Sequence, residues 1–180
     1  MAAASATMPS TTLLAQLFAE HHRRVLVAAY RITGSIADAE DITQAVFLRL
    51  ATSERPIANA GSYLYRAAIN GALDLLRRRN SAATEPLDRA ADVASVGPGS
   101  SPESEVLSRQ LGHTLRIALG DLSPRAAEMF VLRYLEEVPN REIAALMGTS
   151  QAVVAVTLHT ARSRLKKRLT EMDGRINETR

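Results

Sequence analysis

The stretch REIAALMGTSQAVVAVTLHTARSRLKKRL, residues 141–169, decides the fold of the C-terminal half of the chain. Its apolar residues recur at helical spacing on both sides of the turn formed by Gly148, Thr149 and Ser150. This pattern predicts a short helix over residues 141–147, ended by Gly148, and a longer helix capped by Ser150. Two helices joined by so tight a turn form a helix-turn-helix, whose second helix enters a DNA major groove. We expect this motif at about residues 141–165.

The same spacing also fits a helical hairpin that only packs against a third helix. The second helix then carries a cation-rich tail without an acid, made of Arg162, Arg164, Lys166, Lys167 and Arg168. Such a row can follow a phosphate backbone and release its counterions. It can equally be a solvated helix end, because the helix dipole favours cations at the C-terminus. This stretch alone supports both interpretations.

Two further helices are predicted just before the helix-turn-helix. Ser101 followed by Pro102, and Ser123 followed by Pro124, are typical helix starts. We expect Asn140 to cap the short helix, because Pro139 offers no side-chain acceptor. The residues expected to face the core are Val106, Leu107, Leu111, Leu115 and Leu119 in one helix, and Ala127, Phe130, Val131 and Tyr134 in the other. These elements define a domain over residues 101–172.

The N-terminal part, residues 11–79, reads as a domain of three helices. Gly34 is a natural residue to end the first helix, and Ser35 can cap the second, with Asp38 three residues later. Pro56 breaks the pattern before the third helix, which is predicted to end at the arginines 77–79. We expect residues 1–10 to be disordered.

Residues 80–100 form a flexible acidic linker between the two domains in this prediction. The segment is rich in Ser, Ala, Gly and Pro and has almost no large apolar residue. It can span at most ~70 Å when extended. The predicted fold class is therefore all-α, with two small helical domains joined by a flexible linker.

Composition excludes several classes of function. The chain has 180 residues, a formal net charge of +3 and no cysteine, so disulfides, thiolate metal sites and thiol catalysis are absent. The four histidines, His21, His22, His113 and His159, show no metal-ligand spacing. We therefore expect no enzyme activity and no cofactor. The longest apolar run, residues 25–30, is too short for membrane insertion, and without a secretory signal we expect a cytoplasmic protein.

Residues 36–50 read IADAEDITQAVFLRL, and residues 61–79 read GSYLYRAAINGALDLLRRR. Together with residues 122–169, these segments resemble bacterial RNA polymerase sigma factors of the extracytoplasmic-function (ECF) group. The resemblance implies a transcription initiation factor that binds RNA polymerase core and directs it to promoters. It implies contacts with the beta-prime clamp helices and the beta flap, and an anti-sigma factor as a further partner. Polymerase-binding residues are expected from the match at Asp41, Gln44, Phe47 and Leu48.

The segment 61–79 resembles the part of the family that recognises and melts the minus-ten promoter element. The residues expected to contact this DNA are Tyr63, Arg66, Asn70, Arg77 and Arg78, which combine an aromatic ring, an amide and cations suited to unpaired bases and phosphates. Tyr63 can alternatively pack in the core of the domain. By resemblance, the loop at residues 53–59 receives a flipped base. Ala45, Tyr63 and Ile69 depart from the Glu, Trp and Arg usual in the family.

The predicted recognition helix also departs from the family, because cations are missing at Ala155, Thr157 and Thr160. A Gln can pair with adenine, and small or apolar side chains can touch thymine methyl groups, whereas guanine lacks its usual Arg partner. We therefore predict relaxed recognition of the minus-thirty-five element. The residues expected to contact this DNA are Gln151, Ala152, Thr157, Thr160 and Arg162, with Val153 as a further candidate for thymine.

Two alternatives follow from the same departure. The apolar strip can bind a protein, and the chain can then be a sigma-like decoy that binds an anti-sigma factor without initiating transcription. The arginines 77–79 and the second basic tail argue against a decoy, which would not need them. A stand-alone helix-turn-helix repressor would leave the whole N-terminal domain unexplained.

Overall fold

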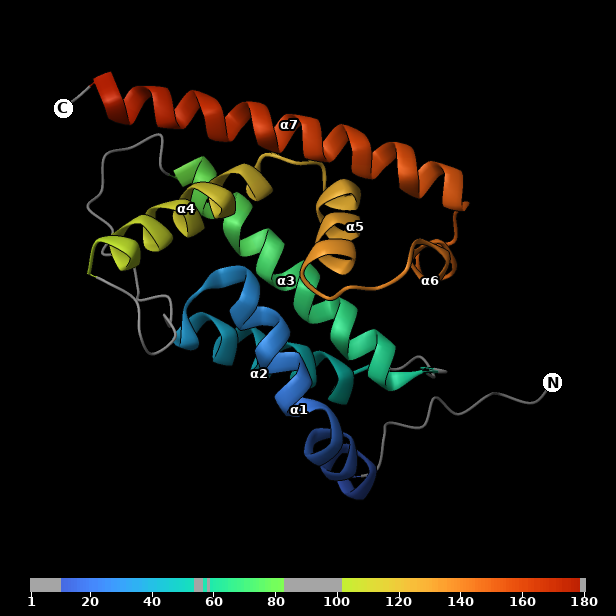
Figure 1. The fold of residues 1–180 in the computed structure, drawn as a ribbon. Coiled ribbons are helices and arrows are strands. Elements are labelled where there is room, and N and C mark those ends of the chain that lie inside the picture. The colour runs from blue at the N-terminus through green and yellow to red at the C-terminus, as the bar shows by residue number, and fades with distance from the viewer. Residues whose placement is uncertain (1–10, 54–56, 58, 83–101, 179–180) are drawn as a thin grey trace.

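The structure, a computed structural model, describes residues 11–53, 57, 59–82 and 102–178, and these residues form helices joined by short turns. The helices are α1 (Thr11–Thr33), α2 (Ile36–Ala51), α3 (Ala60–Ala82), α4 (Pro102–Gly120), α5 (Pro124–Tyr134), α6 (Asn140–Leu146) and α7 (Gln151–Glu178) (Figure 1). The all-α prediction is confirmed. Residues 1–10 and 83–101, which include most of the predicted linker, lie outside the described residues, as does part of the loop at 53–59.

The helix boundaries of the N-terminal part follow from local capping. Gly34 has a φ of +72°, which favours glycine, and its N–H donates to the carbonyl of Tyr30 at 2.7 Å to end α1. Ser35 caps α2 as predicted, and its Oγ accepts a hydrogen bond from the backbone N–H of Asp38 at 3.3 Å. The side chain of Asn59 accepts from the N–H of Ser62 at 2.9 Å and so supports the start of α3.

The C-terminal helices begin at Pro102 and Pro124, as predicted. Gly148 adopts a φ of +58° after α6, and Ser150 Oγ accepts from the N–H of Val153 at 3.3 Å at the start of α7. The expected cap at Asn140 is wrong. Pro139 occupies the cap position, and Asn140 is already the first helical residue, because the extended backbone that begins α6 lies at the proline.

The end of α3 differs from the prediction. The helix continues past the arginines to Ala82, so Asn80 is helical rather than the first linker residue. Its amide Nδ2 donates to the carbonyl of Ile117 at 2.8 Å and to Asp121 Oδ1 at 3.1 Å. Asn80 thereby satisfies a carbonyl in the last turn of α4, a partner far along the sequence that local propensity does not reveal.

A first core cluster lies among α1, α2 and α3. Its buried residues are Val25, Val46, Phe47, Leu50, Leu64 and Ala68. Those of α2 and of α3 recur at helical spacing, and Val25 is the buried contribution of α1, so each helix turns an apolar face to the other two. This cluster belongs wholly to the N-terminal part of the chain and gives that part a core of its own.

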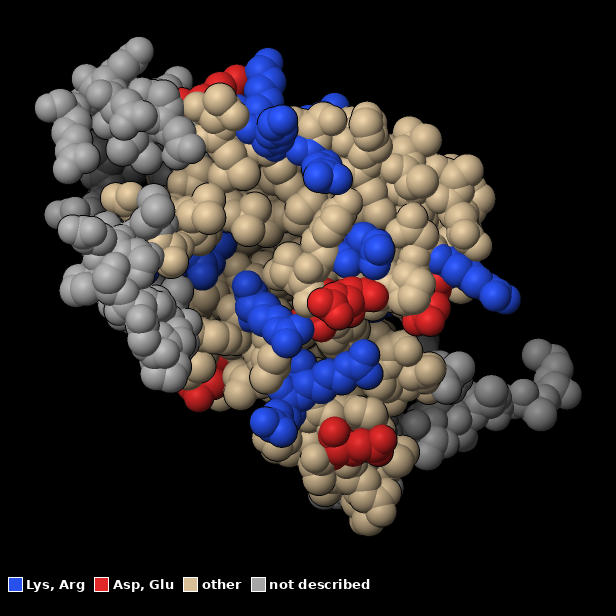
Figure 2. Space-filling view, in the orientation of Figure 1, with Lys and Arg blue, Asp and Glu red and all other residues tan. Residues whose placement is uncertain are grey.

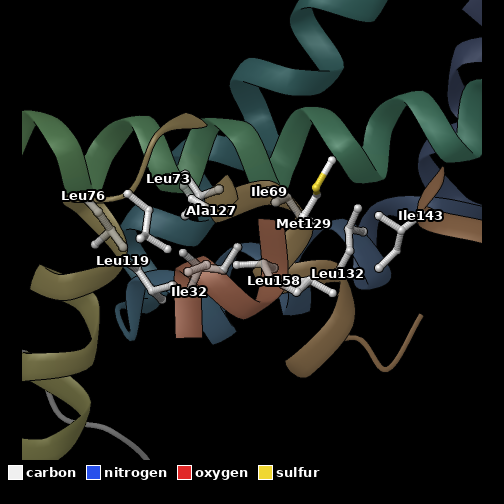
Figure 3. Close-up of a cluster of buried hydrophobic side chains, with 14 of the residues drawn as sticks. Ile32, Ile69, Leu73, Leu76, Leu119, Ala127, Met129, Leu132, Ile143 and Leu158 are labelled. Atoms are coloured by element: carbon white, nitrogen blue, oxygen red, sulfur yellow. The ribbon is translucent and has the colours of Figure 1, made fainter. Parts of the chain in front are cut away.

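A second, larger core cluster joins the N-terminal and C-terminal parts of the chain. Ile69, Leu73 and Leu76 of α3 pack in it with side chains from α4, α5, α6 and α7 (Figure 3). The further residues labelled there are Ile32, Leu119, Ala127, Met129, Leu132, Ile143 and Leu158. In this structure α3 therefore packs against both parts of the chain.

Two residues expected in the core are exposed. Leu111 of α4 is 57% exposed and Tyr134 of α5 is 46% exposed. Leu111 lies one turn before Leu115, which packs against the second core cluster. Tyr134 is the last residue of α5, and its ring lies tilted by 44° against Phe130, with the two centroids 4.6 Å apart. The side chains of Val106 and Leu107 lie outside the described residues.

Candidate functional site

The outward face of α2 carries the residues predicted to bind polymerase. Asp41 and Gln44 are exposed, and Leu48 is 66% exposed. Phe47 is buried instead, with its ring edge against Phe18 and the two centroids 4.9 Å apart. The helix therefore presents a carboxylate, an amide and a leucine on one face, while Phe47 anchors the opposite face in the first core cluster.

The predicted minus-ten residues of α3 have different surroundings. Tyr63 is partly buried against the first core cluster, as its alternative interpretation expects. Arg66 contacts the C-terminal part: its Nε donates to Glu128 Oε1 at 2.7 Å and its Nη1 donates to the carbonyl of Leu146 at 2.8 Å. Asn70 is partly exposed between them and the arginines.

The three arginines at the end of α3 are not equivalent. Arg77 forms an ion pair with Asp74, one turn earlier in the same helix. Arg79 forms an ion pair with Asp38 of α2 at 2.7 Å. Arg78 is exposed between them. The sequence shows three adjacent cations, whereas the structure ties two of them to carboxylates of the chain itself.

The helix-turn-helix is formed by α6 and α7, and α7 presents most of the predicted minus-thirty-five residues. Gln151, Ala152, Thr160 and Arg162 are exposed, and Thr157 is partly buried. Val153 and Val156 are also exposed, by 47% and 67%, while Val154 and Leu158 face the core. The exposed side of the first turns of α7 is therefore small and apolar, and its first cation is Arg162.

The basic tail of α7 lies farther along the same helix. Arg162, Arg164 and Lys166 are exposed. Arg168 is held by Asp121, with its Nε 3.1 Å from Oδ2. Figure 2 shows that the cations on this face form separate groups with acidic groups between them, rather than one continuous basic surface.

The α1–α3 contact beside the C-terminal part contains a buried polar group that the sequence did not single out. The Arg24 guanidinium lies over the Tyr65 ring, 4.3 Å from its centroid. Burial raises the pKa of Tyr65 well above its usual value, and the hydrogen bond and charge of Glu136 raise it further, while Arg24 opposes the shift. The Tyr65 hydroxyl therefore stays protonated as a donor to Glu136.

Sequence reasoning also missed Glu128, a 6% exposed carboxylate in α5. The sequence did contain a sign of this buried carboxylate, because Glu128 lies in the same helical stripe as Val131 and Leu132. An acid in an apolar stripe indicates a buried ion pair. The sequence could not name its partner, Arg66, which lies 62 residues away.

Two further features, a metal-binding cluster and a single membrane-spanning helix, are absent from the described part of the chain. In the described part of the chain, no group of three or more histidine or acidic side chains is arranged to hold a metal ion. No single described helix has the length and hydropathy needed to cross a membrane, and α6 and α7 reach that threshold only as a pair bent by 106°.

Comparison with known families assigns both parts of the chain. The profile of Sigma-70 region 2 matches residues 17–82, and the profile of Sigma-70, region 4 matches residues 114–165. The first match covers α2 and α3 with most of α1, and the second covers α5, α6 and the first turns of α7 with the end of α4.

Individual relatives agree with these matches. The ECF RNA polymerase sigma factor SigE of Mycolicibacterium smegmatis is 32% identical over 169 residues, which are 92% of this chain and 64% of SigE. The RNA polymerase sigma-E factor of Streptomyces avermitilis is 31% identical over 83% of this chain and 80% of that protein. Among solved structures, Mycobacterium tuberculosis extracytoplasmic function sigma factor SigJ matches with a TM-score of 0.50 and 26% identity, over 84% of this chain and 52% of SigJ. The chain thus spans less than two thirds of SigE and about half of SigJ.

Proposed function

Because the chain belongs to the ECF RNA polymerase sigma factors, we propose that it binds RNA polymerase core and directs it to specific promoters. The observation that carries this proposal is the pairing, in one chain, of an exposed polar face on α2 with a helix-turn-helix at α6 and α7. A sigma factor needs both, since it must bind polymerase and DNA at once. Neither a metal site nor a catalytic group is part of this function.

We propose that α2 contacts the beta-prime clamp helices through Asp41, Gln44 and Leu48. An exposed leucine costs solubility without a partner, and its burial in an interface is favourable by ~1.5–3 kcal/mol. The neighbouring carboxylate and amide would fix orientation by hydrogen bonds. Phe47 then acts from beneath, by holding this face of α2 on the first core cluster. The second expected polymerase contact, with the beta flap, would be made by the C-terminal part of the chain.

Promoter melting would use the face of α3 that carries Tyr63, Arg66, Asn70, Arg77 and Arg78. Their spacing places them along one side of the helix, over about 22 Å from Tyr63 to Arg78 at ~1.5 Å per residue. Of the arginines, Arg78 is exposed without an ion pair inside the described chain and is the best placed to meet a phosphate. Arg66 and Arg77 must first exchange their carboxylate partners for DNA.

Contact with the minus-thirty-five element would use the start of α7. Gln151 is suited to adenine, Ala152, Val153, Val156 and Thr157 to thymine methyl groups, and Thr160 and Arg162 to the backbone. No Lys or Arg stands among the exposed residues of α7 before Arg162, so guanine lacks its commonest side-chain partner there. We therefore propose relaxed recognition with a preference for A·T pairs.

A second candidate is a sigma-like decoy that binds an anti-sigma factor and does not initiate transcription. The exposed apolar pair Val153 and Val156 favours it, because such a strip also suits a protein partner. The decoy makes no use of exposed Arg78 or of the exposed cations Arg162, Arg164 and Lys166. For this reason initiation is the preferred function.

Run-off transcription with purified polymerase core distinguishes the two candidates. The full chain is added to core on a library of genomic fragments at moderate salt, and an established sigma factor shows that the core is active. Discrete new transcripts would establish initiation, and alignment of their start sites would give the promoter. Silence, together with failure to bind core, would favour the decoy.

A further inference from the structure

His159 is an exposed residue of α7 and lies outside both core clusters. The face of α7 that packs on the core is formed by buried residues, namely Val154, Leu158, Ala161 and Leu165. Because a helix turns by about 100° per residue, the opposite face carries the residues that lie between them at the same spacing. These outward residues are all exposed: Ala152, Val156, His159 and Ser163. His159 thus lies in the middle of the face that the second helix of a helix-turn-helix presents to DNA.

The imidazole of His159 has no role in holding the fold together. In the part of the chain that the structure describes, this ring forms no hydrogen bond, ion pair or ring contact. Two other histidines are engaged: His21 lies 3.7 Å from Glu20, and the His22 ring stacks on Phe18 with centroids 4.9 Å apart. The ring of His159 is therefore available to a ligand.

The other polar side chain of the outward face is already bonded within the helix. The Ser163 hydroxyl donates to the backbone carbonyl of His159 at 3.0 Å, so its one donor is used by α7 itself. Ala152 and Val156 have no polar side-chain group. Among the four outward residues, all of them in the described chain, His159 is therefore the one with a free side-chain donor.

Small neighbours allow this short side chain to reach a base. Side chains in a helix point toward its N-terminus, so the imidazole is directed over Ala155 and Val156, four and three residues earlier. Neither residue has a long side chain that would hold the helix away from the floor of a groove. An imidazole is shorter than the arginine side chain most often used to contact a base, and it needs this close approach.

The hydrogen-bonding groups of an imidazole match guanine better than the other bases. A neutral imidazole has one N–H donor, and a protonated one has two. In the major groove guanine presents two acceptors, N7 and O6, and no donor. Adenine presents a donor beside its N7, cytosine presents a donor group, and thymine places a methyl group beside its acceptor. Only guanine therefore offers an acceptor to each imidazole N–H in either protonation state.

We propose that His159 recognises one guanine of the minus-thirty-five element by donating from its imidazole to N7 or O6. This inference rests on the proposed function, which supplies the DNA duplex, and it adds one guanine-selective position to a helix that otherwise prefers A·T pairs. Gln151 lies ~12 Å before His159 at ~1.5 Å per residue. Because successive base pairs are ~3.4 Å apart, the guanine lies within about four base pairs of the adenine suited to Gln151.

Selection from a random pool tests this assignment before the promoter is known. The full chain bound to polymerase core is offered duplexes that are randomised across both promoter elements and the spacer, and the retained duplexes are sequenced. Native chain, His159→Ala and His113→Ala are compared. His113 is the matched control, because it is an exposed histidine of α4, outside the helix-turn-helix. We expect one guanine position in the native and His113→Ala motifs that is missing from the His159→Ala motif.

Binding measurements on the selected duplex then test the pairing of residue and base. Exchange of the selected G·C pair for C·G removes both acceptors from that position and should weaken binding of the native chain roughly fivefold, which corresponds to one hydrogen bond of ~1 kcal/mol. The same exchange should leave His159→Ala unaffected, as expected when the two changes remove one shared contact. His159→Gln should prefer adenine at this position, because a glutamine amide pairs with adenine N6 and N7.

Three outcomes would overturn the inference. If all three chains select the same motif, His159 recognises no base, while the proposed function stands. If His159→Ala weakens binding to every duplex by the same factor, the histidine contacts a phosphate instead of guanine. If the native chain with core selects no sequence, although an established sigma factor does so with the same core, the proposed function fails and the inference fails with it.

Discussion

Arg79 of α3 pairs with Asp38 of α2 through both carboxylate oxygens: its Nη2 donates to Oδ1 at 2.7 Å, and its Nη1 lies 2.7 Å from Oδ2. The first contact is a charge-assisted hydrogen bond and the second is a close ion-pair contact. Asp38 also lies in the first turn of α2, where the helix dipole favours a negative charge. The pair therefore fixes the start of α2 to the end of α3.

Arg79→Ala should consequently lower the free energy of unfolding by ~1 kcal/mol, since the guanidinium is partly exposed and solvent screens the pair. Urea denaturation followed by circular dichroism measures this loss. Arg78→Ala, the exposed neighbour, is the control and should change stability by less than about 0.5 kcal/mol. Equal losses in both variants would show that the pair contributes nothing beyond a surface cation.

Arg79→Ala is expected to affect stability more than Arg78→Ala, but the salt dependence of promoter binding by the holoenzyme should respond more to Arg78→Ala. Arg78→Ala removes an exposed cation, so the slope of log K against log salt should fall by ~0.9 for each phosphate that is no longer neutralised. Arg79→Ala should leave the slope nearly unchanged, because its charge is already neutralised by Asp38. A slope that responds only to Arg79→Ala would contradict the surface described for α3.

Asp41→Ala combined with Gln44→Ala should weaken binding to polymerase core while the helical circular dichroism spectrum stays unchanged. Both side chains are exposed, so their removal leaves no cavity and no buried unpaired group. Gln16→Ala combined with Glu20→Ala is a matched control, since it removes an exposed amide and an exposed carboxylate from α1. Unchanged affinity of the α2 variant would remove α2 from the polymerase interface.

The apolar start of α7 predicts sensitivity to thymine methyl groups. Replacing thymine by deoxyuridine in the minus-thirty-five element removes only methyl groups, and each buried methyl group is worth ~0.8 kcal/mol, roughly fourfold in affinity. A Val153→Ala, Val156→Ala variant should lose this sensitivity, whereas deoxyuridine placed outside the element should have no effect. Equal responses of the native chain and the variant would mean that these valines do not read thymine.

The shared core predicts that damage in α3 spreads to the C-terminal helices. Leu73 is fully buried in the second core cluster, so Leu73→Ala should cost ~2–5 kcal/mol. Hydrogen exchange read by mass spectrometry should then show faster exchange in α5 and α6 as well as in α3. Leu64→Ala, in the first core cluster, is the comparison and should affect mainly α1, α2 and α3. Unchanged exchange in α5 and α6 would contradict a shared core.

Helix starts were predictable because their causes are local. Ser35, Pro102 and Ser150 lie within three residues of the groups that they cap or precede, and the sequence displays such signals directly. The helix-turn-helix followed from the same reasoning. The error at Asn140 has a local cause too, since Pro139 already supplies the extended backbone that precedes a helix.

The candidate site was less predictable, because its pairs are distant in sequence. Arg66 and Glu128 are 62 residues apart, and Arg79 and Asp38 are 41 apart, so composition shows free cations where the fold makes ion pairs. Likewise, Leu111 has core spacing but is 57% exposed, whereas Leu115, one turn later, packs against the second core cluster. Periodicity identifies an apolar face, whereas only the packing decides how much of that face is covered.

Asp121 accepts hydrogen bonds from two helices at once, from Asn80 of α3 through Oδ1 and from Arg168 of α7 through Oδ2, each at 3.1 Å. Arg168 lies 17 residues beyond Gln151, so the start of α7 projects ~25 Å from this point at ~1.5 Å per residue. A rotation of ~10° there would displace the start of α7 by ~4 Å, about the rise of three helical residues. Asp121 thus connects α3 directly to α7, and under the proposed function its substitution would change the position of the helix-turn-helix relative to α3 and so the spacing of DNA elements that the chain can contact.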